Sequence, residues 1–191
     1  MKSLKILGIQ GSPRRGGNSD RLLRWFLSEV AEGEEVDILI PSQLRIHFCR
    51  GCRYCESTGL CVIRDDMVEV ITRLLAADRV VVSTPVFFYG LPASFKALVD
   101  RVQPLWARRY VLGEKMPEKM GFLLAVGATK GEQLFEGVVL TIKYFFDAFG
   151  CVYKGGLFFR GFDLPGSVEE CFACREETKA SGRCFFWSEG K

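Results

Sequence analysis

Four cysteines gathered in one short stretch are the side chains best suited to chemistry in this sequence. Cys49, Cys52, Cys55 and Cys61 follow the spacing C-x2-C-x2-C-x5-C. Three cysteines this close cannot share one face of a strand or a helix, whereas a loop can wrap them around a metal centre. Four thiolates suit a 4Fe–4S cluster or a tetrahedral zinc ion, and free or redox-active thiols are the third interpretation. The tight spacing favours a cluster loop over the paired C-x2-C motifs of structural zinc.

A second motif, Gly11-Ser-Pro-Arg-Arg-Gly-Gly-Asn-Ser19, has the composition of an anion-binding turn. It joins an apolar run to a helix pattern, and the free N–H groups and dipole of a helix N-terminus favour an anion. The motif lacks the lysine of a Walker A loop and the G-x-G-x-x-G of a dinucleotide site. It therefore predicts a site for one terminal phosphate. The side chains expected to hydrogen-bond that phosphate are Ser12, Asn18 and Ser19.

The stretch Thr84-Pro-Val-Phe-Phe-Tyr-Gly90 is aromatic where connections are usually polar. Its backbone can bond the edge of a flat conjugated ring while its side chains cover a face of that ring. Alternatively, the aromatic side chains pack on neighbouring helices or on another subunit. A phosphate turn combined with a ring-binding loop predicts a mononucleotide with a large ring, for which FMN is the first candidate.

Alternating strands and helices must position these motifs. Apolar strand patterns at 4–10, 36–40, 79–84, 119–126 and 152–159 alternate with helix patterns at 19–32, 67–77, 92–107, 133–149 and 167–181. This alternation predicts an α/β fold, a flavodoxin-like doubly wound five-stranded parallel sheet of order 2-1-3-4-5. The loops after strands 1, 3 and 4, at 11–18, 85–91 and 127–132, would converge on one site. We expect 1–191 to form one domain, with a cysteine-rich loop at 45–64 and a C-terminal helix and tail at 165–191.

The composition is that of a soluble protein of ordinary size. The chain has 191 residues, is 48% hydrophobic and carries a net charge of +3. That charge is too small to indicate nucleic acid or an anionic membrane as a partner, and no apolar run approaches the roughly 20 residues of a membrane span. We expect a cytoplasmic protein, in which eight cysteines need an explanation other than disulfides. Near the C-terminus, Cys171 and Cys174 are expected to be buried helix thiols.

Three motifs in this order resemble the NAD(P)H-dependent FMN reductase family of flavodoxin-like proteins. They are the turn at 11–19, the stretch at 84–93 and Lys96-Ala-Leu-Val-Asp-Arg101, within a similarity that covers about residues 3–160. The resemblance implies FMN and a homodimer or homotetramer with flavin sites near subunit contacts. It implies that the phosphate is bound by Ser12, Arg14, Asn18 and Ser19, and the isoalloxazine by Pro85, Val86, Phe87, Phe88, Tyr89 and Gly90. Gly127, Thr129 and Gly131 would lie beside the ring or ribityl chain.

The cysteine loop is similar to the compact motif of iron–sulfur flavoproteins, a branch of the same family. This implies electron transfer between a 4Fe–4S cluster and FMN, with a ferredoxin-like carrier as partner. Related flavoproteins without an established cluster carry similar loops followed by Asp-Asp-Met, as at 65–67 here. An NAD(P)H-dependent FMN or quinone reductase without a cluster therefore stays open, as does a non-catalytic module with structural zinc or redox-sensing thiols.

Simple electron transfer needs no side chain that acts as an acid or a base, so the sequence identifies no catalytic residue. Lys96, Asp100 and Arg101 are expected to make helix or subunit contacts. His47 lies beside the cysteine loop, where we expect an ordinary polar contact rather than a metal ligand.

Overall fold

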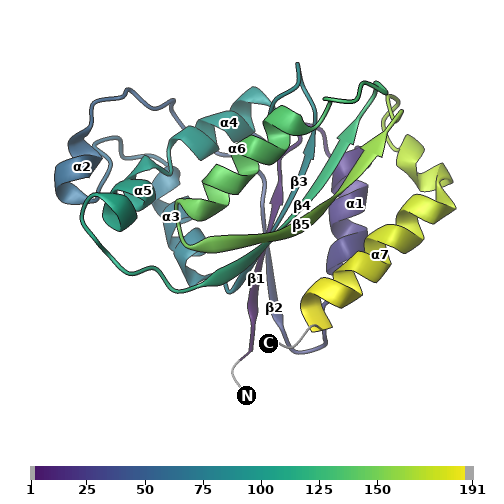
Figure 1. Cartoon of the computed structure of the whole chain (residues 1–191), viewed down its shortest axis with the longest axis horizontal. Helices are drawn as coiled ribbons and strands as arrows, with labels where there is room; N and C mark the ends of the chain where they lie inside the picture. Colours follow the sequence, from purple (N-terminus) through teal and green to yellow (C-terminus); the bar gives the residue numbers. More distant parts are fainter. Residues whose placement is uncertain (1–2, 188–191) are drawn as a thin grey trace.

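A five-stranded parallel sheet with helices on both faces forms the centre of the computed structural model, which describes residues 3–187 (Figure 1). The strands are β1 (Lys5–Gln10), β2 (Glu35–Leu39), β3 (Arg79–Pro85), β4 (Lys119–Gly127) and β5 (Cys151–Arg160). Their order is β2-β1-β3-β4-β5, and every neighbouring pair is parallel. The predicted flavodoxin-like order 2-1-3-4-5 is confirmed.

The central strand β3 has the continuous apolar sequence that is typical of a parallel sheet covered by helices on both faces. Val80, Val81 and Val82 are all fully buried, as expected for a continuous apolar run with helices over both of its faces. Val80 and Val82 belong to one hydrophobic cluster and Val81 belongs to the other. The two clusters therefore lie on opposite faces of the sheet, because successive strand side chains alternate between faces.

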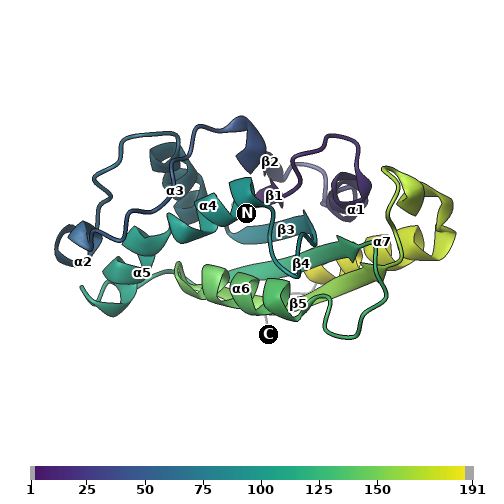
Figure 2. The same cartoon turned by 90° about the horizontal axis from the view of Figure 1, so that it is seen from above.

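Each face of the sheet has its own set of helices (Figure 2). The first set comprises α3 (Met67–Ala76), α4 (Ala93–Asp100) and α6 (Glu136–Asp147). The second comprises α1 (Asn18–Leu27) and α7 (Phe172–Trp187), which pack on each other as well as on the sheet. Both α1 and α7 appear at the right of Figure 1, whereas the short helix α2 (Tyr54–Thr58) lies at the far left.

Several helix boundaries differ from the sequence prediction. The helix predicted at 92–107 is two helices, α4 and α5 (Gln103–Tyr110), so part of the segment predicted as irregular at 108–118 is helical. Pro104 stands in the first turn of α5, where it cannot continue a preceding helix because its ring clashes with the carbonyl four residues earlier. The chain therefore turns at Arg101 and Val102, and this turn directs Arg101 toward the cysteine loop.

The remaining differences are smaller. Helix α1 ends at Leu27 and α6 begins at Glu136, and the predicted last helix is a 3-10 turn, η2 (Ser167–Glu170), followed by α7. The long loop at 41–64 contains α2 and a 3-10 turn, η1 (Pro41–Gln43). Residues 188–191 of the predicted tail lie outside the described residues. Within the described part of the chain, none of the helices has the length and apolar character that crossing a membrane requires.

Candidate functional site

The turn between β1 and α1 is held by hydrogen bonds that its backbone N–H groups donate. The N–H of Gly11 donates to the carbonyl of Ser83 at 2.7 Å, and a Cβ on Gly11 would lie 2.6 Å from the ring of Phe95. Only glycine fits this close approach. Further along, the N–H of Arg14 donates to Oγ of Ser12 at 3.0 Å, and the N–H of Gly16 donates to the Asp20 carboxylate at 2.8 Å. The turn is thus preformed by this chain's own groups.

The start of α1 offers backbone N–H groups to an anion. Its N-cap residue is Gly17, which has no side chain, and no side-chain cap hydrogen bond is present there. The first helical hydrogen bond runs from the N–H of Arg21 to the carbonyl of Gly17, at 3.1 Å. The N–H groups at positions 18–20 have no intrahelical partner, as in any helix, and the helix dipole adds positive potential there. This geometry can bind a phosphate.

The side chain of Asn18 has a different role from the one expected. Its Nδ2 donates to the carbonyl of Leu164 at 3.0 Å, and its Oδ1 accepts from the N–H of Val168 at 3.1 Å. The amide therefore ties the beginning of α1 to the segment that follows β5. The backbone N–H of Asn18 is the group that this arrangement leaves for an anion.

A cavity of about 150 Å³ opens beside this turn. Of the residues predicted to bind the cofactor, it brings together Ser12, Arg14, Asn18, Ser19, Pro85, Val86, Phe87 and Gly127. Its lining does not include Phe88, Tyr89, Gly90, Thr129 or Gly131. Its lining also includes Gly17 and Ala128 of the predicted turn and loop, and it adds residues outside the predicted loops, namely Val126, Phe162, Asp163 and Pro165. The topology contained a signal for the last three, because the loop after β5 leaves the same edge of the sheet as the loops after β1, β3 and β4.

The aromatic turn after β3 has an unusual backbone. Phe88 and Tyr89 have φ values of 48° and 60°, in the left-handed region that residues other than glycine seldom adopt. Two hydrogen bonds between Phe87 and Gly90, at 3.0 and 2.9 Å, close the turn. Phe88 stands fully exposed at its tip. Such backbone strain is more common at ligand sites than elsewhere.

The four loop cysteines line a second, separate cavity of about 220 Å³. Cys49, Cys52 and Cys61 come from the loop itself and Cys55 from α2. The opposite wall is formed by the α4–α5 turn and by α5, including Arg101, Pro104 and Trp106. The structure therefore brings all four predicted ligands to one place.

The thiols are close enough to affect one another electrostatically. Burial is the main cause that raises the pKa of the Cys55 thiol, and the charges of Cys49, Cys52 and Cys61 raise that pKa further. Four negative thiolates in one cavity are unfavourable unless a positive centre compensates them. Across residues 3–187, however, no three His, Cys, Asp or Glu side chains converge closely enough to hold one metal ion.

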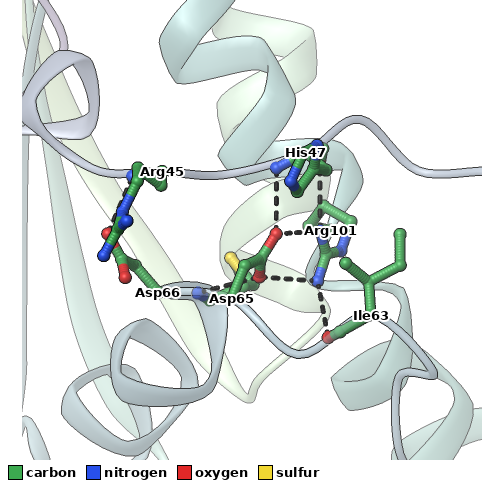
Figure 3. Close-up of polar contacts among 7 residues, drawn as sticks. Arg45, His47, Ile63, Asp65, Asp66 and Arg101 are labelled. Carbon is green, nitrogen blue, oxygen red and sulfur yellow. Dashed lines mark hydrogen bonds and ion pairs between the residues drawn. The ribbon is translucent and has the colours of Figure 1, made fainter.

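A buried ion pair fixes both ends of the cysteine loop (Figure 3). Arg101 donates from Nη1 to Oδ2 of Asp65 at 2.8 Å and from Nη2 to Oδ1 at 3.0 Å. The same nitrogens reach the carbonyl of His47, before the cysteines, and that of Ile63, after them, at 2.8 and 3.3 Å. The backbone of His47 thus makes the polar contact, while the residue itself is exposed. Arg101, expected to make helix or subunit contacts, instead clamps this loop.

The two charges stabilise each other's ionised forms. Burial alone would raise the pKa of Asp65, but hydrogen bonds from Arg101 and from the backbone of His47 and Met67 hold that pKa below its ordinary value. Burial alone would lower the pKa of Arg101, but Asp65 and the Cys61 sulfur together raise it. Both side chains of the Asp65–Arg101 pair therefore stay charged throughout the neutral pH range.

The C-terminal cysteines differ from the prediction. Cys171 and Cys174 form a disulfide at the start of α7 instead of remaining thiols. The two positions are one helical turn apart, which brings their sulfurs close, and the N–H of Cys174 donates to the sulfur of Cys171 at 3.2 Å. Cys184 is an exposed thiol, and burial raises the pKa of the Cys151 thiol to about 12.

Known proteins with similar sequences include iron–sulfur flavoproteins. Iron–sulfur flavoproteins from Methanocaldococcus jannaschii and Methanosarcina thermophila are each 36% identical over 128 residues, which is 66% of this chain. The chain spans less than two thirds of the length of those relatives, 64% and 65% respectively.

Solved structures share the fold. An NAD(P)H:quinone oxidoreductase from Methanothermobacter marburgensis superposes with a TM-score of 0.71 at 17% identity, covering 100% of this chain and 98% of the other. An azoreductase from Bacillus anthracis gives a TM-score of 0.69 at 15% identity, covering 94% of this chain and 99% of the other.

Residues 4–151 match the family described as NADPH-dependent FMN reductase. The chain therefore belongs to the NADPH-dependent FMN reductase family.

Proposed function

We propose that this protein is an FMN-dependent oxidoreductase that passes electrons between a 4Fe–4S cluster and FMN. The observation that carries the proposal is the convergence of Cys49, Cys52, Cys55 and Cys61 on one cavity, apart from the phosphate turn. A cluster supplies one-electron transfer, and FMN can exchange one electron or two. The protein's own part is to hold each group, fix its orientation and shape its electrostatic surroundings.

The phosphate turn fits the phosphate end of FMN. The free N–H groups at the start of α1 and the hydroxyls of Ser12 and Ser19 are suited to a terminal phosphate. The enclosed volume of about 150 Å³ is smaller than the roughly 300 Å³ at which pockets for whole ligands begin. The ring would therefore extend from the cavity toward Phe87 and the exposed turn at 88–90. A second subunit could cover the outer face of the ring there.

The cysteine cavity fits a cluster better than a single ion. A tetrahedral zinc ion lies about 2.3 Å from each sulfur, so its ligands must converge on one point. The four cysteines instead line, together with other residues, a cavity of about 220 Å³, which is several times the roughly 30 Å³ that one water molecule occupies. The relatives named iron–sulfur flavoproteins support the same choice.

A one-electron carrier of the ferredoxin type would reach the protein at the cysteine loop. Cys52 is exposed there, and so are the basic residues Arg50 and Arg64. Positive charge around a redox centre steers an acidic carrier toward it and increases the association rate. Iron–sulfur carriers with acidic surfaces are therefore complementary in charge to the exposed arginines of the cysteine loop.

The proposed assembly is a homodimer or homotetramer. The two cavities share no lining residue, and α2 lies at the far left of the molecule whereas α1 lies to the right of its centre (Figure 1). Trp106, Tyr110 and Tyr144 are exposed and line a groove of about 540 Å³. Exposed aromatic side chains grouped in this way are typical of subunit contacts, and a partner would shorten the path between the two redox sites.

An NAD(P)H-dependent reductase without a cluster is the second candidate. The description of the matching family favours it, since that description names NADPH as the donor. Hydride would then enter FMN directly, and the cysteine loop would have no part in turnover.

Cofactor analysis of anaerobically purified protein tests the proposal. We expect about four irons and four sulfides per chain together with FMN. Cys55→Ser should lose iron and sulfide but keep FMN, whereas Cys184→Ser, which alters an exposed thiol on α7, should keep all three. Wild-type protein that binds FMN but takes up no iron after anaerobic reconstitution would favour the second candidate.

A further inference from the structure

We propose that Arg101 is a positioning residue whose Nε–H donates a hydrogen bond to a sulfur in the cysteine cavity, making the group bound there easier to reduce. The inference rests on the proposed function, because it concerns the cluster that Cys49, Cys52, Cys55 and Cys61 would hold. It assigns Arg101 a role in the electron transfer itself, in addition to the structural clamp already described.

A complete count of the Arg101 donors leaves one N–H available. A guanidinium has five N–H donors, two on each terminal nitrogen and one on Nε. Nη1 donates to His47 and Asp65, and Nη2 donates to Ile63 and Asp65, so all four terminal donors are used. Nε makes no hydrogen bond of ordinary geometry within the described part of the chain, although the Cys61 sulfur lies close enough to raise the pKa of the guanidinium.

The remaining donor lies where a ligand is needed. The Arg101 side chain is only 1% exposed, so its Nε cannot be satisfied by bulk solvent. A buried donor without an acceptor is unfavourable and rare. Arg101 also lines the cysteine cavity, and Cys61 is among the groups that interact with its guanidinium. A thiolate or sulfide sulfur in the cavity is the acceptor that completes the count.

The clamp holds Nε in a fixed position. Four hydrogen bonds to Asp65 and to the two loop ends prevent the planar guanidinium from rotating (Figure 3). Asp65 also neutralises the positive charge of Arg101. The hydrogen bond from Nε–H is therefore the main way in which Arg101 affects the electrostatic surroundings of a group bound in the cavity. Donors to cluster sulfurs stabilise the reduced form, which carries more negative charge, and so raise the reduction potential.

Arg101→Lys tests this role because it keeps a positive charge opposite Asp65 but removes the Nε–H. Iron, sulfide and FMN contents are measured first, and the cluster is then titrated anaerobically with detection by electron paramagnetic resonance. We expect a normal iron content and a lower potential, with the ratio of reduced to oxidised cluster falling about tenfold at a fixed applied potential. For one electron this corresponds to about 59 mV. A loaded variant with an unchanged potential would overturn the inference.

The matched control is Arg108→Lys. Arg108 lies on α5 and forms a similar doubled contact with Glu114, at 2.5 and 2.6 Å, but it does not line the cysteine cavity. This control should keep the wild-type potential. An equal drop in both variants would show that the effect comes from the general stability of α5, and it would also overturn the inference.

A second measurement does not depend on the fold of any Arg101 variant. Wild-type protein is prepared with 15N-labelled arginine, and pulsed electron paramagnetic resonance of the reduced cluster is used to detect nearby 15N nuclei. We expect a 15N coupling that survives in Arg50→Lys, since Arg50 is an exposed arginine of the same cavity. Loaded wild-type protein without such a coupling, or a coupling that Arg50→Lys abolishes, would contradict the inference. Wild-type protein that takes up no iron would instead refute the proposed function.

Discussion

Asp65 and Arg101 form a doubly hydrogen-bonded ion pair whose side chains are only 5% and 1% exposed. The pair joins the start of α3 to the α4–α5 turn, 36 positions further along the chain. The pair fixes the geometry of the cysteine cavity, because the same guanidinium also bonds both ends of the cysteine loop.

Removing the carboxylate of this pair should destabilise the fold strongly. In Asp65→Asn the buried guanidinium loses its counter-ion, and breaking one side of a buried pair typically costs about 3–5 kcal/mol. Asp100→Asn is the matched control, because Asp100 pairs with Lys96 at a comparable 2.7 Å but both side chains are exposed. The control should lose only about 0.5 kcal/mol. Urea unfolding measures both losses in unfolding free energy. Equal losses would show that the buried pair stabilises the fold no more than the exposed pair does.

The same pair predicts how stability depends on pH. The folded-state pKa of Asp65 is held below its ordinary value of about 3.9, so its contribution is fully present above that value. The contribution is lost as the pH falls through the lowered folded pKa. The difference in unfolding free energy between the wild type and Asp65→Asn should therefore be constant near pH 7 and shrink below about pH 4. A difference that stays constant down to pH 2 would contradict the assigned pKa direction.

Ser12→Ala should weaken FMN binding if the turn at 11–19 holds the phosphate. Ser12 is buried in the cavity wall, and its Oγ accepts from the N–H of Arg14, which leaves the hydroxyl hydrogen for an anion. Loss of one such hydrogen bond is worth about 1 kcal/mol, or roughly fivefold in the dissociation constant. Fluorescence titration of the apoprotein with FMN measures the change. Ser28→Ala, at the opposite end of α1, should bind as the wild type does, and unchanged affinity in Ser12→Ala would reject the phosphate assignment.

The disulfide between Cys171 and Cys174 should contribute only modestly to stability. It closes a loop of four residues, for which the chain-entropy relation gives about 2 kcal/mol. The double variant Cys171→Ser/Cys174→Ser should therefore stay folded and lose about that amount. Chemical denaturation with and without a reducing agent tests this, because the reducing agent should lower the stability of the wild type but leave the variant unaffected. A variant that does not fold would contradict the prediction.

The sequence predicted the fold well because the relevant signals are local. Continuous apolar runs such as Val80–Val82 indicate buried parallel strands, and the alternation of strands with helices leaves few topologies. The sequence also contains a signal for the split between α4 and α5, since proline is tolerated in the first turn of a helix but not in its interior. The apolar periodicity continues across the turn, and it therefore predicts a single helix over 92–107.

The site was predicted less completely because its contacts join distant parts of the chain. Asn18 was expected to bind phosphate through its side chain, but its amide bonds Leu164 and Val168, about 150 positions away. Likewise, no local pattern shows that Arg101 reaches His47, 54 positions earlier. The structure brings several residues of the predicted loops to one cavity, whereas their individual hydrogen-bond partners depend on tertiary packing.

The central claim is that electrons pass between the cysteine-bound cluster and FMN, and the rate of flavin reduction by a reduced ferredoxin tests it most directly. Wild type, Cys55→Ser and Cys184→Ser, each loaded with FMN, are mixed anaerobically with reduced ferredoxin while the flavin absorbance is followed. We expect that wild type and Cys184→Ser are reduced at the same rate, and that Cys55→Ser is reduced at least about tenfold more slowly. Equal rates in all three proteins would show that electrons reach FMN without the cysteine site, which would contradict the account.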